Sequence, residues 1–186
     1  ALLSSAHALL SAKNASQIGI DIPSTAPNWP NIQQRKDAIV AGFRKGMAGS
    51  AQADKLTLIQ GHATVASPNH INVDTSQGTV EIEADKLILA TGSETIELSN
   101  IPFDGDVVIS SKEALSLPEI PRSMVIVGGG VIGCEMACAY AAMGTKVTIV
   151  EALQQLVPME DQWVARLVER EFKRIGIDSI TGQKVA

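Results

Sequence analysis

The chain has 186 residues, enough for one domain or parts of two, with 45% hydrophobic and 19% charged residues, as in globular proteins. These proportions exclude a disordered tail and a fibrous repeat. A net charge of −5, an aromatic content of 3% and the absence of a Lys/Arg run argue against a nucleic-acid partner. With only two cysteines, no secretory signal and no apolar stretch long enough to cross a membrane, the sequence favours a soluble, cytoplasmic protein.

The first half of the chain predicts two helices followed by a block of short strands. Leucines and alanines at helical spacing predict a helix over residues 1–15, which has no N-cap signal and so should begin inside an element that starts upstream. Residues 18–22 predict a short extended piece, and Asn31 is the expected N-cap of a second helix that runs to about Asp54. Beyond it, a meander that ends in a buried strand is predicted, with strands at 56–59, 61–65, 70–73, 79–82 and 87–90.

The second half changes to an alternation of strands and helices. Ser110 and Ser111 can cap a short helix over residues 112–117, after which Pro118 and Pro121 mark a boundary. The elements that follow are predicted in the order strand, helix, strand, helix and strand, at 124–127, 131–143, 146–150, 160–175 and from about 177. This order is typical of a parallel sheet covered by helices.

Three glycines follow the strand at 124–127 with the spacing G-x-G-x-x-G: Gly128, Gly130 and Gly133. Between a strand and a helix, the first glycine permits a tight turn, the second lets a pyrophosphate approach the backbone, and the third lets helix and strand pack closely. The next strand ends in Glu151, roughly 20 positions further on, where an acidic side chain binds the ribose 2′-hydroxyl. Because this carboxylate repels a 2′-phosphate and no arginine follows closely, the sequence predicts NAD rather than NADP. The alternative is a glycine-rich turn that binds no nucleotide.

Other residues with potential chemistry lie on the helix after the glycines. Cys134 and Cys138 are four positions apart, so their Cβ atoms should be about 5–6 Å apart, too far for a disulfide, and we expect them to be small core residues. Glu135 lies in the first turn of this helix, where the helix dipole stabilises a carboxylate. The three histidines do not have metal-ligand spacing, so no metal site is predicted.

Three segments together resemble a known family: Leu87-Ile-Leu-Ala-Thr-Gly-Ser-Glu94, Pro118-x-x-Pro121 and Met124-Val-Ile-Val-Gly-Gly-Gly-Val-Ile-Gly-Cys-Glu135. With them, essentially the whole chain resembles the flavin- and pyridine-nucleotide-dependent disulfide oxidoreductases. Shorter motifs at 1–5, 61–63, 158–161 and 172–176 most resemble the members that oxidise dihydrolipoyl groups. The resemblance implies an α/β fold: part of an FAD-binding domain with a β-meander at residues 1–117, then a partial Rossmann-type NAD-binding domain at 118–186.

The resemblance also implies the cofactors FAD and NAD and assigns residues to each. Ala63 would meet the adenine end of FAD, and Thr91, Gly92 and Ser93 would line FAD at the junction of the two domains. Glu135 would pair with a flavin-side lysine near the nicotinamide. The residues that would hold NAD are Gly128, Gly129, Gly130, Val131, Ile132, Gly133, Cys134, Glu135 and Glu151.

The activity implied is oxidation of a dihydrolipoyl group with NAD as acceptor, through FAD and a redox disulfide. In the family, the redox Cys-x4-Cys pair and the FAD glycine motif would precede Ala1 and the acid/base His-Glu pair would follow Ala186, so we expect a central fragment without catalytic residues. The implied partners are the dihydrolipoyl domain of 2-oxo acid dehydrogenase or glycine cleavage complexes and a second copy in a homodimer, with no nucleic acid and no membrane. The alternatives are mercuric or glutathione-type reductases, NADH oxidases and a non-catalytic NAD-binding module.

Overall fold

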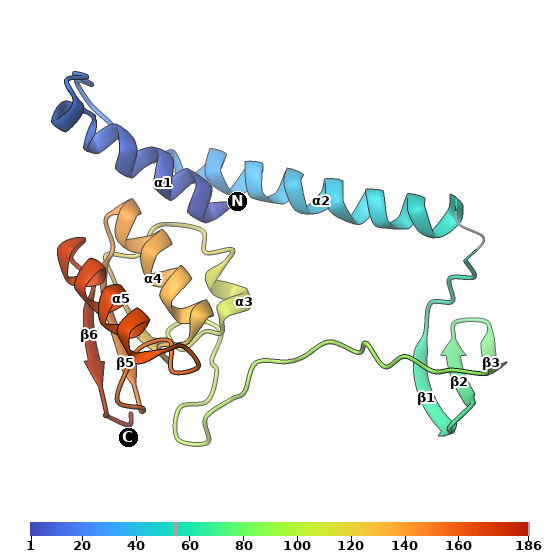
Figure 1. Ribbon diagram of the computed structural model, residues 1–186. Coiled ribbons are helices and arrows are strands. Elements are labelled where there is room, and N and C mark those ends of the chain that lie inside the picture. Colours follow the sequence, from blue (N-terminus) through green and yellow to red (C-terminus); the bar gives the residue numbers. More distant parts are fainter. Residues whose placement is uncertain (54–55, 186) are drawn as a thin grey trace. The chain divides into compact units, whose positions relative to one another are not determined.

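The computed structural model describes residues 1–53 and 56–185, in which helices and strands are mixed (Figure 1). The helices are α1 (Leu2–Lys13), the 3-10 helix η1 (Ala15–Ile18), α2 (Trp29–Ala53), α3 (Ser111–Ala114), α4 (Val131–Met143) and α5 (Gln162–Arg174). The strands are β1 (His62–Ser67), β2 (His70–Thr75), β3 (Gly78–Glu83), β4 (Ser123–Val127), β5 (Lys146–Glu151) and β6 (Asp178–Thr181). The predicted α/β class is confirmed.

Contacts divide the chain into two compact units. Residues 1–39 together with the chain from residue 95 onward form the first unit, and residues 40–94 form the second. The division therefore falls within α2 rather than at the end of an element. The expected domain boundary between residues 117 and 118 stays a prediction about the organisation of the whole protein.

The first unit is built on a parallel sheet of order β4-β5-β6. Helix α4 connects β4 to β5 and α5 connects β5 to β6, so two successive β-α-β units form the sheet. Register pairs Val125 with Thr148 and Val150 with Ile180. The predicted strands at 124–127 and 146–150 and the predicted helix at 131–143 are confirmed to within a residue at each end.

The core of this unit lies around α4. Tyr140 on α4, Ile149 on β5 and Ile177 before β6 are almost completely buried. Alanines occupy many of the inward positions of α4, and helix α1 packs against the same helix. Short side chains at such a contact let two helix backbones approach closely, which explains why α4 carries few large residues.

The segment at α3 is held by side chains from two longer helices. Ser110 is the N-cap of α3, and it forms a capping box with Glu113. Three side chains then donate hydrogen bonds to backbone carbonyl groups at the exit of α3: Trp29 to Leu117, Lys36 to Leu115 and Tyr140 to Ala114. The predicted helix at 112–117 is shorter in the structure: α3 ends at Ala114, the Ser116 N–H bonds to the Glu113 carbonyl in a tighter turn, and Pro118 disfavours a helical conformation in the residue before it.

The second unit contains an antiparallel meander of order β1-β2-β3. Its strands confirm the predictions at 61–65, 70–73 and 79–82, with a tight turn at residues 75–78. Gly61 precedes β1 at a point of close approach: a Cβ atom there would overlap the carbonyl oxygen of Asp74 and lie 2.8 Å from Val73 Cγ1. Only glycine fits at the entry to this sheet.

Two predicted strands, at 56–59 and 87–90, are wrong: both segments are irregular. Their apolar side chains are exposed, with Leu58 at 67% and Leu89 at 68%. A strand is stabilised only when a neighbouring strand accepts its backbone hydrogen bonds, and in residues 1–53 and 56–185 no strand pairs with either segment. The apolar residues that predicted these strands can be recognised from local sequence alone. Whether a strand forms depends on a second strand that forms hydrogen bonds with its backbone.

Two predictions near the N-terminus are also corrected. The piece at 18–22 is not a strand: Ile18 ends η1, Gly19 lies in a turn with a φ of 80°, and residues 20–22 are irregular. Helix α2 begins at Trp29, and the side-chain oxygen of Asn28 accepts a hydrogen bond from the Asn31 N–H at 3.1 Å, so Asn28 rather than Asn31 caps the helix. The predicted end at about Asp54 lies outside the described residues.

Candidate functional site

The turn between β4 and α4 contains two glycines that the fold itself requires. Gly128 has a φ of 108°, which glycine adopts without strain, and its N–H donates to the carbonyl oxygen of Val150 at 2.9 Å. At Gly133 a Cβ atom would overlap the carbonyl oxygen of Gly128 and lie 3.2 Å from Ile126 Cγ2. The start of α4 therefore packs directly on the end of β4.

Gly130 differs, because nothing in the protein opposes a side chain there. It is the N-cap of α4, and a Cβ atom added to it would meet no atom within 4 Å. Across the described residues no side chain caps this end of α4, and Val131 and Ile132 are 60% and 62% exposed. The first-turn N–H groups and the positive end of the helix dipole suit an anion at this position.

Glu151 at the end of β5 is joined to the turn through Gly129. Its side chain is buried, with Oε2 accepting from the Gly129 N–H at 2.6 Å and Oε1 accepting from the Leu153 N–H at 2.7 Å. Each carboxylate oxygen has two lone pairs, so both can accept a further hydrogen bond. These acceptor oxygens fit a ribose hydroxyl, and the negative charge disfavours a second phosphate at the same place.

The two cysteines of α4 are free thiols, one buried and one half-buried, as expected for core residues. Burial, with a smaller contribution from Cys138, raises the pKa of Cys134 to about 11, and its Sγ lies 3.3 Å from the Gly129 carbonyl oxygen, to which it donates. Burial and the charge of Glu135 also raise the pKa of Cys138. Both groups are therefore thiols at neutral pH, which is unsuited to thiol–disulfide exchange.

The remaining predicted site residues lie on exposed surfaces. Glu135 is exposed, but it lies just beyond the first turn of α4, which contains no acidic residue, so the prediction that placed it in the first turn is wrong. Ala63 lies on β1 opposite Val73, and Thr91, Gly92 and Ser93 lie in an irregular, exposed segment in which Gly92 has a φ of 80°. These four residues belong to the second unit, and the residues assigned to NAD belong to the first.

The sequence interpretation missed two residues that contact the turn. Leu156 is fully buried, and its Cδ2 lies 2.5 Å from the position that a Cβ atom would take on Gly129. Val157 donates its N–H to the carbonyl oxygen of Gly129 at 2.7 Å. The apolar pair before Pro158 was the available signal, but no sequence pattern indicates which backbone group such a loop would contact.

Comparison with known proteins defines the class. A family profile for the pyridine nucleotide-disulphide oxidoreductases matches residues 4–186, and the chain belongs to this family. The predicted resemblance is thus confirmed, as is the cofactor prediction at the level of the family, which uses FAD and NAD.

Curated relatives narrow the comparison. The chain is 39% identical to a dihydrolipoyl dehydrogenase of Bacillus subtilis over 99% of its length and 32% identical to that of Chlamydia pneumoniae over 100%. It is also 33% identical over 95% of its length to leghemoglobin reductase of Glycine max. The chain spans 41%, 40% and 34% of these proteins, so it covers about two fifths of the length of the two dehydrogenases.

Solved structures share the fold. The crystal structure of LpdA from Mycobacterium tuberculosis matches with a TM-score of 0.85 at 24% identity, over 100% of this chain and 41% of that one. The flavoprotein disulfide reductase RclA from Escherichia coli matches with a TM-score of 0.73 at 26% identity, over 99% of this chain and 39% of that one.

Among the described residues, no helix is long and apolar enough to span a membrane, and no group of side chains is suited to hold a metal ion.

Proposed function

We propose that this chain is the segment of a dihydrolipoyl dehydrogenase that binds NAD and contributes one edge of the FAD site. The observation that carries the proposal is the hydrogen bond from Gly129 to Glu151, because it joins an acidic ribose acceptor to an open phosphate turn. The names of the curated relatives support dihydrolipoyl groups as the substrate class. The whole-protein activity is inferred from these relatives, of which the chain covers only part.

In this proposal NAD is held at the start of α4. The pyrophosphate lies beside Gly130, where a side chain is absent and backbone N–H groups are available. Glu151 accepts a hydrogen bond from the ribose and repels a 2′-phosphate, which gives preference for NAD over NADP. Glu135, one turn into the helix and exposed, is placed on the nicotinamide side, where it pairs with a cation of the flavin domain.

The contribution to FAD is smaller. Ala63 and the segment Thr91, Gly92 and Ser93 offer exposed backbone, and the left-handed conformation of Gly92 suits a close approach of a ligand to the chain. Within residues 56–94 no helix start supplies N–H groups for a second pyrophosphate. These residues therefore fit contacts at the edge of the cofactor rather than its phosphate anchor.

The proposed reaction converts a dihydrolipoyl group and NAD⁺ into the lipoyl disulfide, NADH and a proton. Bound FAD supplies the two-electron link between the dithiol and the nicotinamide. Residues of this chain bind and orient: the helix start neutralises phosphate charge, and Glu151 fixes the ribose. The thiols and the base that act on the substrate are not among these residues.

The proposal extends to partners and location. A dihydrolipoyl domain of a 2-oxo acid dehydrogenase or glycine cleavage complex would deliver the substrate, and the enzyme would act as a homodimer. Two free, protonated cysteines are compatible with a reducing compartment, so we place the protein in the cytoplasm.

Replacement of Glu151 tests the nucleotide assignment. In the purified full-length protein, Glu151→Ala should weaken NAD binding by about tenfold or more and narrow the preference over NADP, since a hydrogen bond and a repulsive charge are both lost. Titration of protein fluorescence with each nucleotide measures both effects. Glu160→Ala, an exposed carboxylate in the neighbouring loop, is the matched control and should change neither affinity. An unchanged NAD/NADP ratio in Glu151→Ala would refute the role of Glu151.

The choice among family members needs a substrate assay. RclA and leghemoglobin reductase show that relatives with other names share this segment. We expect reduction of NAD by dihydrolipoamide, and little oxidation of NADPH by glutathione disulfide. The opposite result would assign the protein to the glutathione-type reductases and would also contradict the proposed preference for NAD over NADP.

A further inference from the structure

The loop from Ala152 to Glu160, which follows β5, contacts the glycine turn at its central residue. Leu156 covers the side of Gly129, and the N–H of Val157 donates to the Gly129 carbonyl oxygen at 2.7 Å. Leu156 is fully buried and Val157 is 8% exposed, so this part of the loop is in the core rather than on the surface. The contact is therefore a fixed part of the fold.

Val157 adopts a backbone conformation that its side chain and its neighbour both disfavour. Its φ is 43°, and it is the only residue other than glycine with a positive φ among those described. A β-branched side chain is a clear outlier in this region, and a following proline restricts the residue before it to extended conformations. Strain of this kind persists only where the surroundings enforce it, and it concentrates at functional sites.

Two hydrogen bonds enforce the conformation of Val157. Its N–H donates to the carbonyl oxygen of Gly129. Its own carbonyl oxygen accepts a hydrogen bond from the Glu160 N–H at 2.8 Å, and this bond closes a turn with Pro158 at the second position. The side chain of Gln155 donates to the carbonyl oxygen of Glu160 at 3.0 Å and supports the same turn. The loop thus presents the Val157 N–H in a fixed direction.

The consequence for the turn follows from the planarity of the peptide bond. The carbonyl of Gly129 and the N–H of Gly130 belong to one trans peptide unit, so the two groups point in opposite directions. When Val157 and the thiol of Cys134 hold the Gly129 oxygen, the Gly130 N–H must point away from the loop. The Gly129 N–H is held by Glu151, so neither peptide flanking this residue can rotate independently.

We propose that Val157 is a positioning residue for the pyridine nucleotide: its left-handed backbone fixes the Gly129–Gly130 peptide plane and so directs the Gly130 N–H toward the pyrophosphate. This role rests on the proposed function, because it needs a phosphate group at Gly130. Val157 acts through the turn and has no contact with the nucleotide of its own. Its backbone conformation, rather than its apolar side chain, is the feature that matters.

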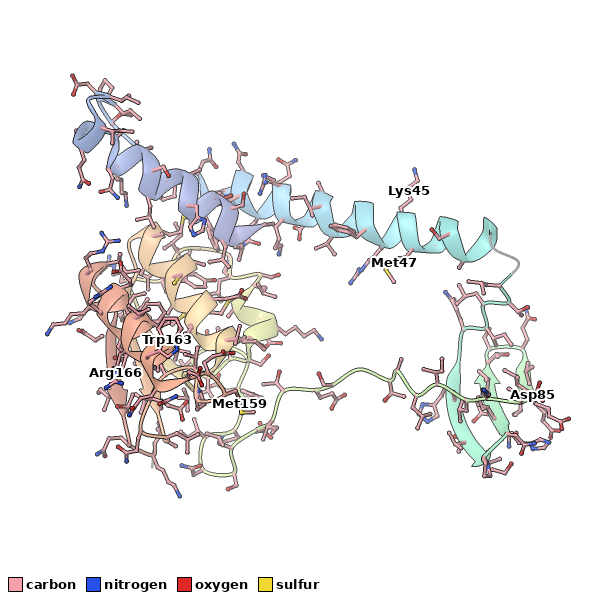
Figure 2. The ribbon with its side chains drawn as sticks, in the orientation of Figure 1. Lys45, Met47, Asp85, Met159, Trp163 and Arg166 are labelled. Atoms are coloured by element: carbon pink, nitrogen blue, oxygen red, sulfur yellow. The ribbon has the colours of Figure 1, made fainter. Side chains whose placement is uncertain are left out.

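Three substitutions at Val157 separate the effect of its backbone conformation from that of its side chain. Val157→Gly keeps the N–H and adopts a φ of 43° without strain, whereas Val157→Ala keeps the N–H and most of the strain. Val157→Pro removes the N–H and sets φ near about −65°. Met159→Ala is the control, since Met159 (Figure 2) lies in the same turn and is 94% exposed. Each variant is made in the full-length protein, and NAD binding is measured by calorimetry together with the flavin spectrum and the melting temperature.

The expected result is a split between nucleotide affinity and flavin content. Val157→Pro should weaken NAD binding at least about tenfold with bound flavin retained, whereas Val157→Gly should stay within about threefold of the unsubstituted protein. Val157→Gly should also melt no lower than Val157→Ala, although it removes one more buried carbon, because the strain is relieved.

Two outcomes would overturn the proposal. The first is that Val157→Pro binds NAD with normal affinity. The second is that Val157→Gly binds NAD more weakly than Val157→Ala and melts at a lower temperature, which is the order expected if only side-chain packing matters. If Val157→Pro does not fold, the NAD affinities and melting temperatures of Val157→Gly and Val157→Ala test the proposal on their own. Failure of the proposed function has a different signature, because the unsubstituted protein itself would then not bind NAD.

Discussion

At the scale of single residues, Gly130 and Gly133 occupy the same motif for different physical reasons. A side chain on Gly133 is excluded by the protein, since it would overlap the Gly128 carbonyl. A Cβ atom on Gly130 meets no atom within 4 Å, so the packing of the described residues does not require glycine there. Under the proposed function, the motif contains one glycine required for folding, Gly133, and one required for binding, Gly130, and mutagenesis can separate the two roles.

Gly130→Val should abolish NAD binding and NAD reduction while flavin and melting temperature stay unchanged, because the side chain projects into open space at the phosphate position. Gly133→Val should instead lower the melting temperature, since the start of α4 must move away from β4. Calorimetry with NAD and a thermal scan of both variants give the comparison. Equal losses of stability in both would contradict the division of roles.

The thiol of Cys134 should make stability depend on pH in the alkaline range. Burial raises its pKa to about 11 in the folded chain, above the ordinary value of about 8.5 for a thiol in an unfolded chain. The folded state keeps its proton where the unfolded state loses it, so this contribution to stability is complete below the unfolded pKa and decreases as pH rises from about 8.5 toward 11.

Two measurements follow. At pH 8 the native protein should react with a disulfide reagent at Cys134 at least about a hundredfold more slowly than the denatured protein does. In urea titrations between pH 8 and 11, Cys134→Ser should show a smaller alkaline loss of stability than the unsubstituted protein. Fast labelling of Cys134 at pH 8 would contradict its burial.

At the scale of elements, local sequence predicts an element well when its stabilising partners are also local. The β4, α4 and β5 predictions are confirmed because the glycine turn and the alternating apolar residues define them within about thirty positions of sequence. The segments at 56–59 and 87–90 have strand composition but no pairing strand among residues 1–53 and 56–185, and they are irregular. Helix α3 has only four residues, and its cap explains why so short a helix forms.

Ser110→Ala should destabilise the protein by about 1 kcal/mol, because a buried N-cap side chain that accepts from the Lys112 N–H is lost. Hydrogen bonds from the Ser110 side chain and from backbone lower the pKa of Glu113, so its share of the capping box is present above the unfolded pKa and is lost as pH falls. The effect of Ser110→Ala in denaturant titrations should therefore be smaller at pH 3 than at pH 7. If Ser110→Ala lowers stability equally at both pH values, the ionised Glu113 does not contribute to the cap.

At the scale of the whole chain, the sequence predicted the fold class, the family and the glycine turn, since each has a motif with fixed spacing. It did not predict Val157, because a positive φ at a valine before proline contradicts every local preference and arises only from contacts with Gly129 and Glu160. It also did not predict that Glu151 would be bonded to the turn. The residues assigned to FAD rest on the resemblance, and they stay predictions.

A polypeptide of residues 1–186 alone should retain no FAD and should not reduce NAD with dihydrolipoamide. The edge contacts proposed for Ala63 and for Thr91, Gly92 and Ser93 would give too little binding energy without a phosphate anchor, and both thiols on α4 are protonated. The sample should be colourless after mixing with FAD and desalting. Turnover that survives replacement of both cysteines by serine would show that another group in the chain carries the redox chemistry.

The three side chains that donate to the exit of α3 have a mechanical consequence. Trp29 holds the carbonyl group of Leu117, Lys36 holds that of Leu115 and Tyr140 holds that of Ala114, directly before Pro118. Movement of this segment away from these side chains requires the three hydrogen bonds to break, and one of them belongs to a buried tyrosine. The segment should therefore keep its place while the rest of the chain fluctuates, and amide exchange at Ala114 and Leu115, whose N–H groups donate to the carbonyl groups of Ser110 and Ser111, should be slow.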